Sequence, residues 1–387
     1  MKLKLAIVTP RYGPDVLGGA ETLARTLAEQ LASQGHQVHV WASCATDYYR
    51  WENVYPAGIT THNQVTVRRF PITSYDHARF TELSRQLEQQ WGLGWAQQKA
   101  WLAASAHSQP LYDALSQEAS RYDAILVLPY QAALAQAAAW VVPERTILIP
   151  CLHDEPYAYL ELTRLLLQEA FGVLFLTPEE QLFTQNQLNL NLPRAALLGA
   201  AVSPPTTTAP SRNPANPPYL LALGRLEAGK NMPLLYDYMQ RLATDGSPVK
   251  LLLAGDGPVP PPAQPPFERL GFVPEAEKIA LLAGATALVQ PSLNESFSLV
   301  LLEAWLANCP VLVHQSCQVT SGHVRRSGGG LAFATYGEFA HAVNLLVAKP
   351  ELASQMGENG RSYTHQNYTW PLVINRLETT LQSWLTN

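Results

Sequence analysis

The chain has 387 residues, of which 47% are hydrophobic and 15% are charged, a balance that is typical of well-packed globular proteins and excludes a disordered chain. The formal net charge of -5 offers no excess of positive charge to hold a nucleic-acid backbone, so a dedicated DNA or RNA binder is not expected. The length is too great for one ordinary domain and suits two.

Membrane and metal signals are weak. No stretch approaches the roughly 20 apolar residues of a membrane span, and the apolar run that follows Lys2 and Lys4 stops at Pro10, too early for a signal peptide. The cysteines form no CxxC pair and have no histidine at metal spacing. We therefore expect a cytoplasmic protein with reduced thiols and no zinc site.

Short apolar runs alternate with amphipathic segments, the pattern of parallel strands joined by crossover helices. Leu23, Leu27 and Leu31 recur every four residues and Gly35 follows them, which predicts a helix over 20–33. Residues 81–120, rich in Gln, Ala and Trp, predict further helices. Strands are expected in the first half over 3–9, 37–42, 124–128, 146–151 and 172–177.

A proline-rich segment over 203–218 cannot form a helix or a central strand and predicts an interdomain linker. A second proline cluster, over 258–266, predicts a surface loop in place of a helix. After the linker, strands are expected over 219–223, 249–254, 287–290 and 310–314. Helices are expected after Asn231, Glu275 and Ser296, and over 339–347, 351–363 and 371–385.

A pair of glycines, Gly18 and Gly19, follows the first expected strand and opens the first expected helix. Such a pair lets a phosphate or sugar approach the backbone closely, and the free amides at a helix N-terminus favour negative charge. A plain strand-to-helix turn is the alternative, because a lone glycine pair is a weak motif. The segment is not GxGxxG, which counts against a dinucleotide dehydrogenase.

Two cations, Arg225 and Lys230, follow the first strand expected after the linker. Open α/β sheets bind ligands at the carboxyl ends of their strands, and both cations can neutralise a diphosphate. Asn231 fits an N-cap, with Pro233 in the first helical turn. A solvated surface is the alternative for two cations taken alone.

Two carboxylates, Glu295 and Glu303, are eight residues apart, the first before an expected helix and the second two turns inside it. Glu295 can accept hydrogen bonds from sugar hydroxyls and Glu303 from a ribose. The amides at the start of this helix favour a phosphate, and they belong to Ser296, Phe297, Ser298 and Leu299. One ligand could therefore span the cations and both carboxylates.

Together these motifs resemble the retaining GT-B glycosyltransferases of family 4, also called glycosyltransferase group 1. The resemblance covers nearly the whole chain in the right order and rests on Gly18-Gly19-Ala20-Glu21, Gly224-Arg225-x-Glu227-x-x-Lys230, Leu253-Ala254-Gly255-Asp256-Gly257-Pro258 and Glu295-x7-Glu303. The chain departs from it at Ser296 and Ser298, where the family commonly has glycines. Donor preference is therefore not carried over.

The resemblance implies an α/β fold of the GT-B type, with two Rossmann-like domains of parallel sheets that face each other across a cleft. It also implies a C-terminal helix that crosses back onto the first domain. The expected parts are an N-terminal acceptor-binding domain over 1–202, a Pro-rich linker over 203–218, a nucleotide-sugar-binding domain over 219–366 and the crossing helix over 367–387.

The resemblance further implies roles for single residues of the second domain. Arg225 and Lys230 would hold the donor diphosphate and stabilise the departing nucleotide. Glu303 would bind the ribose and Glu295 the transferred sugar. Val273 would face the base through its backbone.

His153 matches a family histidine that follows a late strand of the first domain and lies beside the transferred sugar. A capping or core role is the alternative for a lone histidine after a strand. For the neighbouring carboxylates, Asp154 and Glu155, the alternative is to serve as N-terminal helix caps. Aromatic and polar side chains of the same domain are acceptor candidates, with core packing as the alternative: Tyr12, Asp15, Trp91 and Trp95.

The resulting expectation is a metal-independent, retaining hexosyltransferase without a cofactor, whose co-substrate is a UDP- or GDP-sugar and whose acceptor is a saccharide or lipid-linked saccharide. The resemblance suggests front-face attack, in which a donor phosphate oxygen takes the acceptor proton and no enzymic nucleophile is needed. Peripheral attachment to the inner membrane face through Arg68, Arg69 and Arg79 is a further expectation, which the acidic total charge opposes.

Other functions stay open. A nucleotide-sugar epimerase or a phosphorylase would use the same fold, and release of free nucleotide would separate a transferase from an epimerase. A catalytically silent nucleotide-sugar sensor or partner subunit would bind donor without transfer or hydrolysis. The presence of Arg225, Lys230, Glu295 and Glu303 argues against such a loss of activity.

Overall fold

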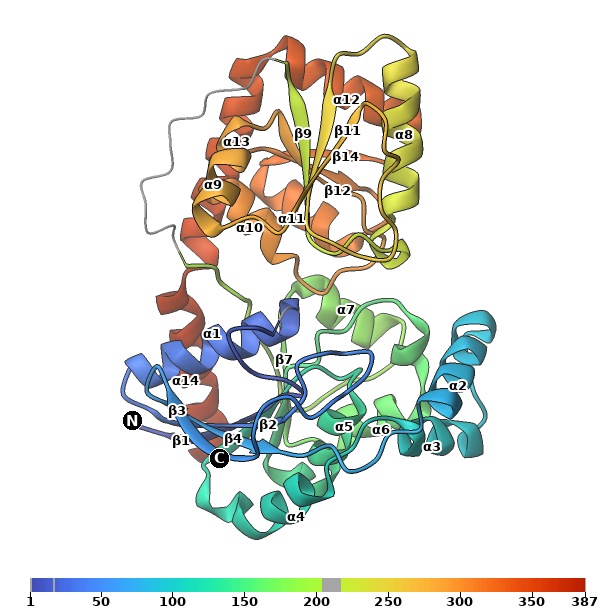
Figure 1. Cartoon of the computed structure of the whole chain (residues 1–387). Helices are drawn as coiled ribbons and strands as arrows, with labels where there is room; N and C mark the ends of the chain where they lie inside the picture. The colour runs from blue at the N-terminus through green and yellow to red at the C-terminus, as the bar shows by residue number, and fades with distance from the viewer. Residues whose placement is uncertain (1, 17, 204–216, 387) are drawn as a thin grey trace. The chain divides into compact units, whose positions relative to one another are not determined.

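The computed structural model describes residues 2–16, 18–203 and 217–386, which form two compact units (Figure 1). Unit 1 comprises Met1–Gly199 with Val373–Asn387, and unit 2 comprises Ala200–Leu372. Most of the expected linker, residues 204–216, lies outside the described residues. Each unit is therefore described by itself.

Within the described residues, unit 1 is built on an eight-stranded sheet in the order β3-β4-β2-β1-β5-β6-β7-β8, parallel except for the antiparallel β3. The strands are β1 (Lys4–Val8), β2 (Gln37–Ser43), β3 (Gly58–His62), β4 (Val65–Phe70), β5 (Ala124–Val127), β6 (Thr146–Leu148), β7 (Gly172–Phe175) and β8 (Ala195–Leu197). The helices are α1 (Gly19–Ser33), α2 (His77–Gln90), α3 (Trp95–Ala104), α4 (Gln109–Glu118), α5 (Ala133–Val141), α6 (Glu161–Glu169) and α7 (Pro178–Asn186). All strands and helices predicted for this half are present.

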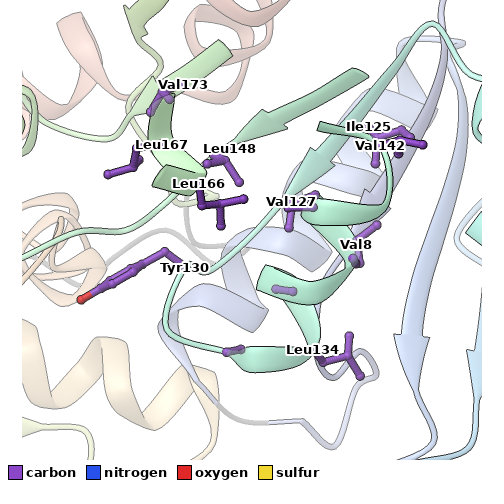
Figure 2. Close-up of a cluster of buried hydrophobic side chains, with 14 of the residues drawn as sticks. Val8, Ile125, Val127, Tyr130, Leu134, Val142, Leu148, Leu166, Leu167 and Val173 are labelled. Atoms are coloured by element: carbon purple, nitrogen blue, oxygen red, sulfur yellow. The ribbon is translucent and has the colours of Figure 1, made fainter. Parts of the chain in front are cut away.

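Aliphatic side chains of the central strands form the core of unit 1 (Figure 2). Val8 of β1 and Val127 of β5 pack with Leu134 of α5 and Leu166 of α6, and none of the four is more than 2% exposed. Each such side chain contributes about 1.5–3 kcal/mol when fully buried. This packing holds the strand ends, and hence the loops that follow them, in place.

The outer hairpin of β3 and β4 escaped prediction. All residues of β3 are exposed, so the strand lacks the alternation of buried and exposed residues that identifies a half-buried strand. The turn between the strands places Asn63 and Gln64 at φ 48° and 65°, the left-handed geometry of a tight hairpin turn.

Unit 2 holds, within the described residues, a six-stranded parallel sheet in the order β11-β10-β9-β12-β13-β14. The strands are β9 (Tyr219–Leu223), β10 (Lys250–Ala254), β11 (Phe267–Gly271), β12 (Ala287–Gln290), β13 (Val311–His314) and β14 (Gly330–Phe333). Figure 1 shows helices on both sides of this sheet, namely α8 (Met232–Thr244), α9 (Glu275–Gly284), α10 (Leu299–Leu306), α11 (Gln318–Ser327), α12 (Tyr336–Ala348) and α13 (Pro350–Asn367). The proline cluster over 258–266 is a loop, as predicted, and it leads from β10 to β11, a strand that was not predicted.

The last helix, α14 (Trp370–Thr386), returns to unit 1. Glu378 accepts from His36 Nε2 at 2.7 Å, and Arg376 donates to the carbonyl of Leu198 at 3.4 Å. Trp384 packs against the backbone of Gly172, at the start of β7. The expectation that the C-terminal helix crosses back to the first domain is confirmed.

Among the described residues, no helix is long and apolar enough to cross a membrane. The four cysteines, Cys44, Cys151, Cys309 and Cys317, are buried, and none of these described residues forms a disulfide.

The contact between Gly172 and Trp384 leads to a stability prediction. A methyl group at residue 172 would lie 2.4 Å from the nearest ring carbon of Trp384, so Gly172→Ala forces the helix or the strand to shift and lowers the free energy of unfolding by about 1–3 kcal/mol. Urea unfolding followed by tryptophan fluorescence measures the loss. Gly337→Ala on α12 is the control, because nothing lies within 4 Å of its added methyl; equal losses in the two variants would contradict the packing argument.

Candidate functional site

The site in unit 2 lies where the direction of the chain through the sheet reverses. β9 is hydrogen-bonded to β10 on one side and to β12 on the other. The chain runs outward from β9 through β10 to β11, and outward from β12 through β13 to β14. Because the two sets of crossovers diverge, the loops after β9 and β12 part at the carboxyl edge, which is where open α/β sheets bind ligands.

Lys230 and Glu295 meet at this edge although 65 residues separate them. Lys230 Nζ donates to Glu295 Oε1 at 2.6 Å, and Gln290 Nε2 donates to the same oxygen at 2.8 Å. The side chains of Lys230 and Glu295 are 26% and 10% exposed, so solvent screens the pair only in part. Two motifs that are far apart in the sequence therefore place charged side chains in contact.

Backbone packing holds the loop that carries Lys230. A methyl group at Gly255 would lie 1.9 Å from the carbonyl oxygen of Gly224, and one at Gly257 would lie 2.3 Å from that of Leu226. Only glycine lets two backbones approach so closely. The Leu226 amide donates to the carbonyl of Asp256 at 2.9 Å. The motif Leu253–Pro258 thus supports the cation loop.

Asn231 and Arg225 differ in part from expectation. Asn231 precedes α8 as expected, but it adopts φ 57° and its side chain makes no cap hydrogen bond. Its amide instead donates to the carbonyl of Pro291 at 3.1 Å and so ties the loop after β9 to the loop after β12. Arg225 is 61% exposed and lies 3.1 Å from Glu227, without a described contact to Glu295.

Glu303 lies closer to the start of its helix than predicted. The helix begins at Leu299 rather than after Ser296, so Glu303 is one turn inside it instead of two. Its carboxylate accepts from Lys278 Nζ of α9 at 2.9 Å. Burial raises the pKa of Glu303, and the ammonium of Lys278 offsets part of that rise. Lys278 was missed because only the packing of α9 on α10 brings it to this carboxylate.

The segment between the two glutamates is held in an unusual conformation. Ser298 adopts φ 73°, a left-handed conformation for a residue with a side chain, and its buried hydroxyl has no hydrogen-bond partner among the described residues. The resembled family commonly has a glycine at this position, and a glycine adopts this conformation without strain. Ser296 and Leu299 lie on either side of Phe297 and Ser298 in the chain. Val273 lies elsewhere, in the loop between β11 and α9.

Phe297 anchors this segment in a buried aromatic cluster. The centre of its ring lies 5.1 Å from the ring centres of His323 and of Tyr368. His323 Nδ1 lies 3.0 Å from the hydroxyl of Tyr363. Burial, with a smaller contribution from the charge of Arg326, lowers the pKa of His323 to about 3. The imidazole is therefore neutral at physiological pH.

In unit 1, the glycine pair occupies the start of α1. Gly18 adopts φ 149° and precedes the helix, and Gly19 is its first residue with nothing within 4 Å of an added methyl. Glu21 folds back toward Gly18 and pairs with Arg11, which follows β1. The helix start is therefore open at Gly19, whereas the carboxylate of Glu21 lies against Gly18.

His153 follows β6 in a loop that a buried carboxylate holds. Glu180 is 1% exposed and accepts from the amides of Leu152 at 2.6 Å and Leu176 at 2.5 Å. Cys151 adopts φ 59° at the turn. Glu180 was not predicted, since its role arises from tertiary contacts between the ends of β6 and β7.

The carboxylates beside His153 do not cap a helix. Glu155 precedes the 3-10 turn Pro156–Tyr159 without a side-chain cap bond and instead accepts from Tyr130 and Gln131. Its other oxygen lies 3.4 Å from His153 Nδ1 without the geometry of a hydrogen bond. Asp154 accepts from the hydroxyl of Tyr159 at 2.7 Å.

The remaining acceptor candidates divide into buried and exposed residues. Tyr12 is 1% exposed, so core packing accounts for it, and Asp15 accepts from the hydroxyl of Tyr55 at 3.1 Å. Trp91 and Trp95 are 54% and 48% exposed.

The arginines expected to touch headgroups are partly engaged elsewhere. Arg68 pairs with Glu118 at 2.8 Å, and Arg69 donates to the carbonyl of Tyr12 at 3.1 Å. These contacts leave Arg68 and Arg69 poorly placed for an anionic surface.

The two parallel sheets, the helices that cover them and the returning C-terminal helix define the GT-B fold. Solved structures agree: sucrose-phosphate synthase from Thermosynechococcus elongatus has a TM-score of 0.71 at 16% identity and covers 100% of both chains. The Anabaena protein HepE, in complex with UDP and glucose, has a TM-score of 0.67 at 17% identity, over 98% of this chain and 100% of that one. At these identities the likeness establishes the fold alone.

Residues 205–363 match the family described as glycosyl transferases group 1, so this segment belongs to that family. A GDP-mannose-dependent mannosyltransferase of Mycobacterium tuberculosis is 28% identical over 138 residues, 34% of this chain and 36% of its own length. A glycosyltransferase 1 domain-containing protein of Xenopus tropicalis is 30% identical over 107 residues, 28% of this chain and 31% of its own. The matched stretches thus span about a third of these relatives.

The strained serine allows a first test of this site. Replacing Ser298 by glycine relieves the left-handed conformation and should raise the free energy of unfolding by about 1 kcal/mol. Ser296→Gly is the matched control two residues away, because Ser296 has no positive φ, and there the added chain freedom should lower stability slightly. Thermal unfolding compares the two, and a Ser298→Gly variant less stable than the parent would contradict the account.

The buried histidine predicts sensitivity to acid. The pKa of His323 is lower in the folded state, about 3, than its ordinary value of 6.5, so the unfolded chain binds the extra proton. The resulting stability is complete above about pH 6.5 and is lost as pH falls toward 3, by up to about 1.4 kcal/mol per pH unit. Urea midpoints of the parent and of His323→Gln should therefore converge on acidification. His341→Gln, at an exposed position, is the control, and its urea midpoint should change with pH as that of the parent does. If the midpoints of the parent and of His323→Gln instead differed by the same amount at every pH, the prediction would be contradicted.

Proposed function

We propose that the protein is a retaining glycosyltransferase that moves a hexose from a nucleotide-diphosphate sugar to a saccharide or lipid-linked acceptor, without a metal. The observation that carries this proposal is the contact of Lys230 with Glu295 at the point where β9 and β12 diverge. A cation for the diphosphate and a carboxylate for sugar hydroxyls are thereby placed at one sheet edge, within a segment of the group 1 family.

Lys230 and Arg225 would meet the charge that develops on the departing nucleotide. An ammonium carries three donors, so Lys230 can keep its bond to Glu295 and still donate to a phosphate. Arg225 is exposed and can turn toward the second phosphate. The backbone amides at the start of α10 add the positive end of a helix dipole. Fixed donors of this kind stabilise the transition state of transfer.

Glu295 and Glu303 would bind the two sugars of the donor, the transferred hexose and the ribose. Glu295 would accept hydrogen bonds from the transferred hexose, and Glu303, whose side chain pairs with Lys278, would accept from the ribose. The backbone of Val273 would face the base. His153 is proposed to lie beside the transferred hexose, as the family resemblance implies. The acceptor proton would pass to a donor phosphate oxygen, so no side chain is proposed as nucleophile.

The choice of donor and the location are also proposals. A UDP- or GDP-sugar is supported by HepE, whose structure holds UDP and glucose, and by the mycobacterial relative, which is named as GDP-mannose-dependent. That relative is named as acting on a phosphatidylinositol dimannoside, which supports a lipid-linked acceptor here. Such an acceptor would place the protein in the cytoplasm, at the inner membrane face.

Removal of the Lys230 charge tests this function. Lys230→Met keeps the aliphatic stem and removes the phosphate donor, so kcat should fall by about 10²–10³. The measurement is release of free nucleotide from a panel of UDP- and GDP-sugars, with and without acceptor. Lys250→Met is the control, since Lys250 forms an exposed pair with Glu268 at the opposite end of β10 and should not affect turnover.

Two outcomes would count against the proposal. Unchanged turnover in Lys230→Met would remove the assigned role of the cation. Donor binding by the parent protein without transfer or hydrolysis would instead favour a catalytically silent nucleotide-sugar-binding protein.

A further inference from the structure

The side chain of Lys278, in the first turn of α9, lies between two carboxylates of unit 2. Its Nζ is 2.9 Å from Glu275 Oε2 on the same helix and 2.9 Å from Glu303 Oε1 on α10. The side chains of Lys278 and Glu303 are 19% and 26% exposed, whereas that of Glu275 is 68% exposed. The contact between the two helices is therefore the better shielded of the two. The family resemblance assigns no role to Lys278.

Lys278 connects two residues that have proposed nucleotide contacts. Its backbone amide donates to the carbonyl of Pro274 at 2.9 Å, the residue that follows Val273, and its side chain reaches Glu303. Val273 is proposed to face the base and Glu303 to bind the ribose, and these two groups are joined directly in a nucleotide. One residue therefore ties the loop before α9 to the carboxylate on α10.

The pairing with Lys278 leaves acceptor capacity on Glu303 for a ligand. Lys278 contacts Oε1, and within the described part of the chain no hydrogen bond or ion pair uses Oε2. An ionised carboxylate has two oxygens with about four acceptor positions. A charged donor that is fixed on one oxygen also holds the other oxygen in a defined direction, which is how a supporting residue prepares a binding group for its ligand.

The ammonium of Lys278 also favours the charged form of this carboxyl group. Burial raises the pKa of Glu303, the ammonium of Lys278 lowers it, and the carboxylate of Glu275 raises it. If Lys278 were removed, the two remaining influences would both favour the protonated form. A protonated carboxyl group has fewer acceptor positions and forms weaker hydrogen bonds with hydroxyl donors than a carboxylate does.

We propose that Lys278 is the positioning residue that makes this site selective for ribonucleotides: it holds the Glu303 carboxylate in place to accept hydrogen bonds from the ribose hydroxyls. The inference rests on the nucleotide-sugar binding within the proposed function, because Glu303 has a ribose to bind only if the donor carries a nucleotide. It adds a residue that acts through Glu303 and predicts discrimination against deoxyribose.

Nucleotide binding measures this selectivity directly. Titration calorimetry on the full chain at neutral pH would use UDP and GDP and the 2′-deoxy and 3′-deoxy forms of each. The parent should prefer a ribonucleotide over at least one of its deoxy forms by about tenfold, the effect of one hydrogen bond to a charged acceptor. Lys278→Met should bind the ribonucleotide about tenfold more weakly and lose the preference. A residue that only supports packing would weaken both forms alike and leave the preference unchanged.

A double-mutant cycle tests whether Lys278 acts through Glu303. Glu303→Gln should lose the same preference, and adding Lys278→Met to it should change the affinity by less than about twofold. Lys278→Arg keeps a cation and should retain most of the preference. Lys250→Met, which removes an exposed lysine of the same unit, is the control and should bind like the parent. An intact preference in Lys278→Met, or losses from the two single variants that multiply in the double variant, would each overturn the inference.

Turnover of nucleotide sugars separates this inference from the proposed function. A parent that transfers or hydrolyses a donor, while Lys278→Met keeps the parental preference for ribose, would refute the inference alone. A parent that prefers ribonucleotides through Lys278 but neither transfers nor hydrolyses any donor would refute the proposed function alone. A parent that binds neither UDP nor GDP would refute both.

Discussion

The ammonium of Lys230 and the carboxylate of Glu295 lie 2.6 Å apart because β9 and β12 are neighbours in a parallel sheet and their following loops leave the same edge. The proposed donor chemistry depends on this contact. Desolvation of two partly buried charges offsets much of their attraction, so such a pair adds little net stability. Its proposed value lies in placing a cation and a sugar-binding carboxylate together. The glycines of the loop after β10 and the amide of Asn231 hold the two loops in that relation.

The same principle organises unit 1. Its sheet also reverses direction, between β1 and β5, and the glycine pair and the loop of His153 follow the carboxyl ends of β1 and β6. Each feature has a partner that no local pattern reveals, such as Glu180 beneath the His153 loop and Glu155 between His153 and Gln131. The two sheets share the order of six strands, and each carries its own set of loops at the carboxyl edge.

Much of the fold follows from sequence because the central strands are aliphatic and the crossover helices amphipathic. The strands that escaped prediction lie at or near sheet edges, where burial is incomplete. β3 is fully exposed, most of β4 is only partly buried, and β8, β11 and β14 contain exposed residues. The spacing of the motifs singled out Lys230 and the two glutamates as candidates, and Lys230 and Glu295 do lie in contact. Lys278, Gln290 and Gln131 were not singled out, because their contacts arise from packing between elements that are distant in the chain.

Departures from the resembled family also become interpretable. Ser298 holds a left-handed conformation that suits glycine, so the chain tolerates strain at the segment that would meet the donor phosphates. The start of α10 lies later than the pattern suggested, which places Glu303 one turn from its first residue and within reach of Lys278.

The most direct test of the central claim is a crystal structure of the protein with UDP or GDP. The account predicts a diphosphate within hydrogen-bond distance of Lys230 Nζ and of the amides at the start of α10, with the ribose on Glu303. A nucleotide bound elsewhere on unit 2, with the Lys230–Glu295 pair untouched by phosphate or ribose, would contradict it.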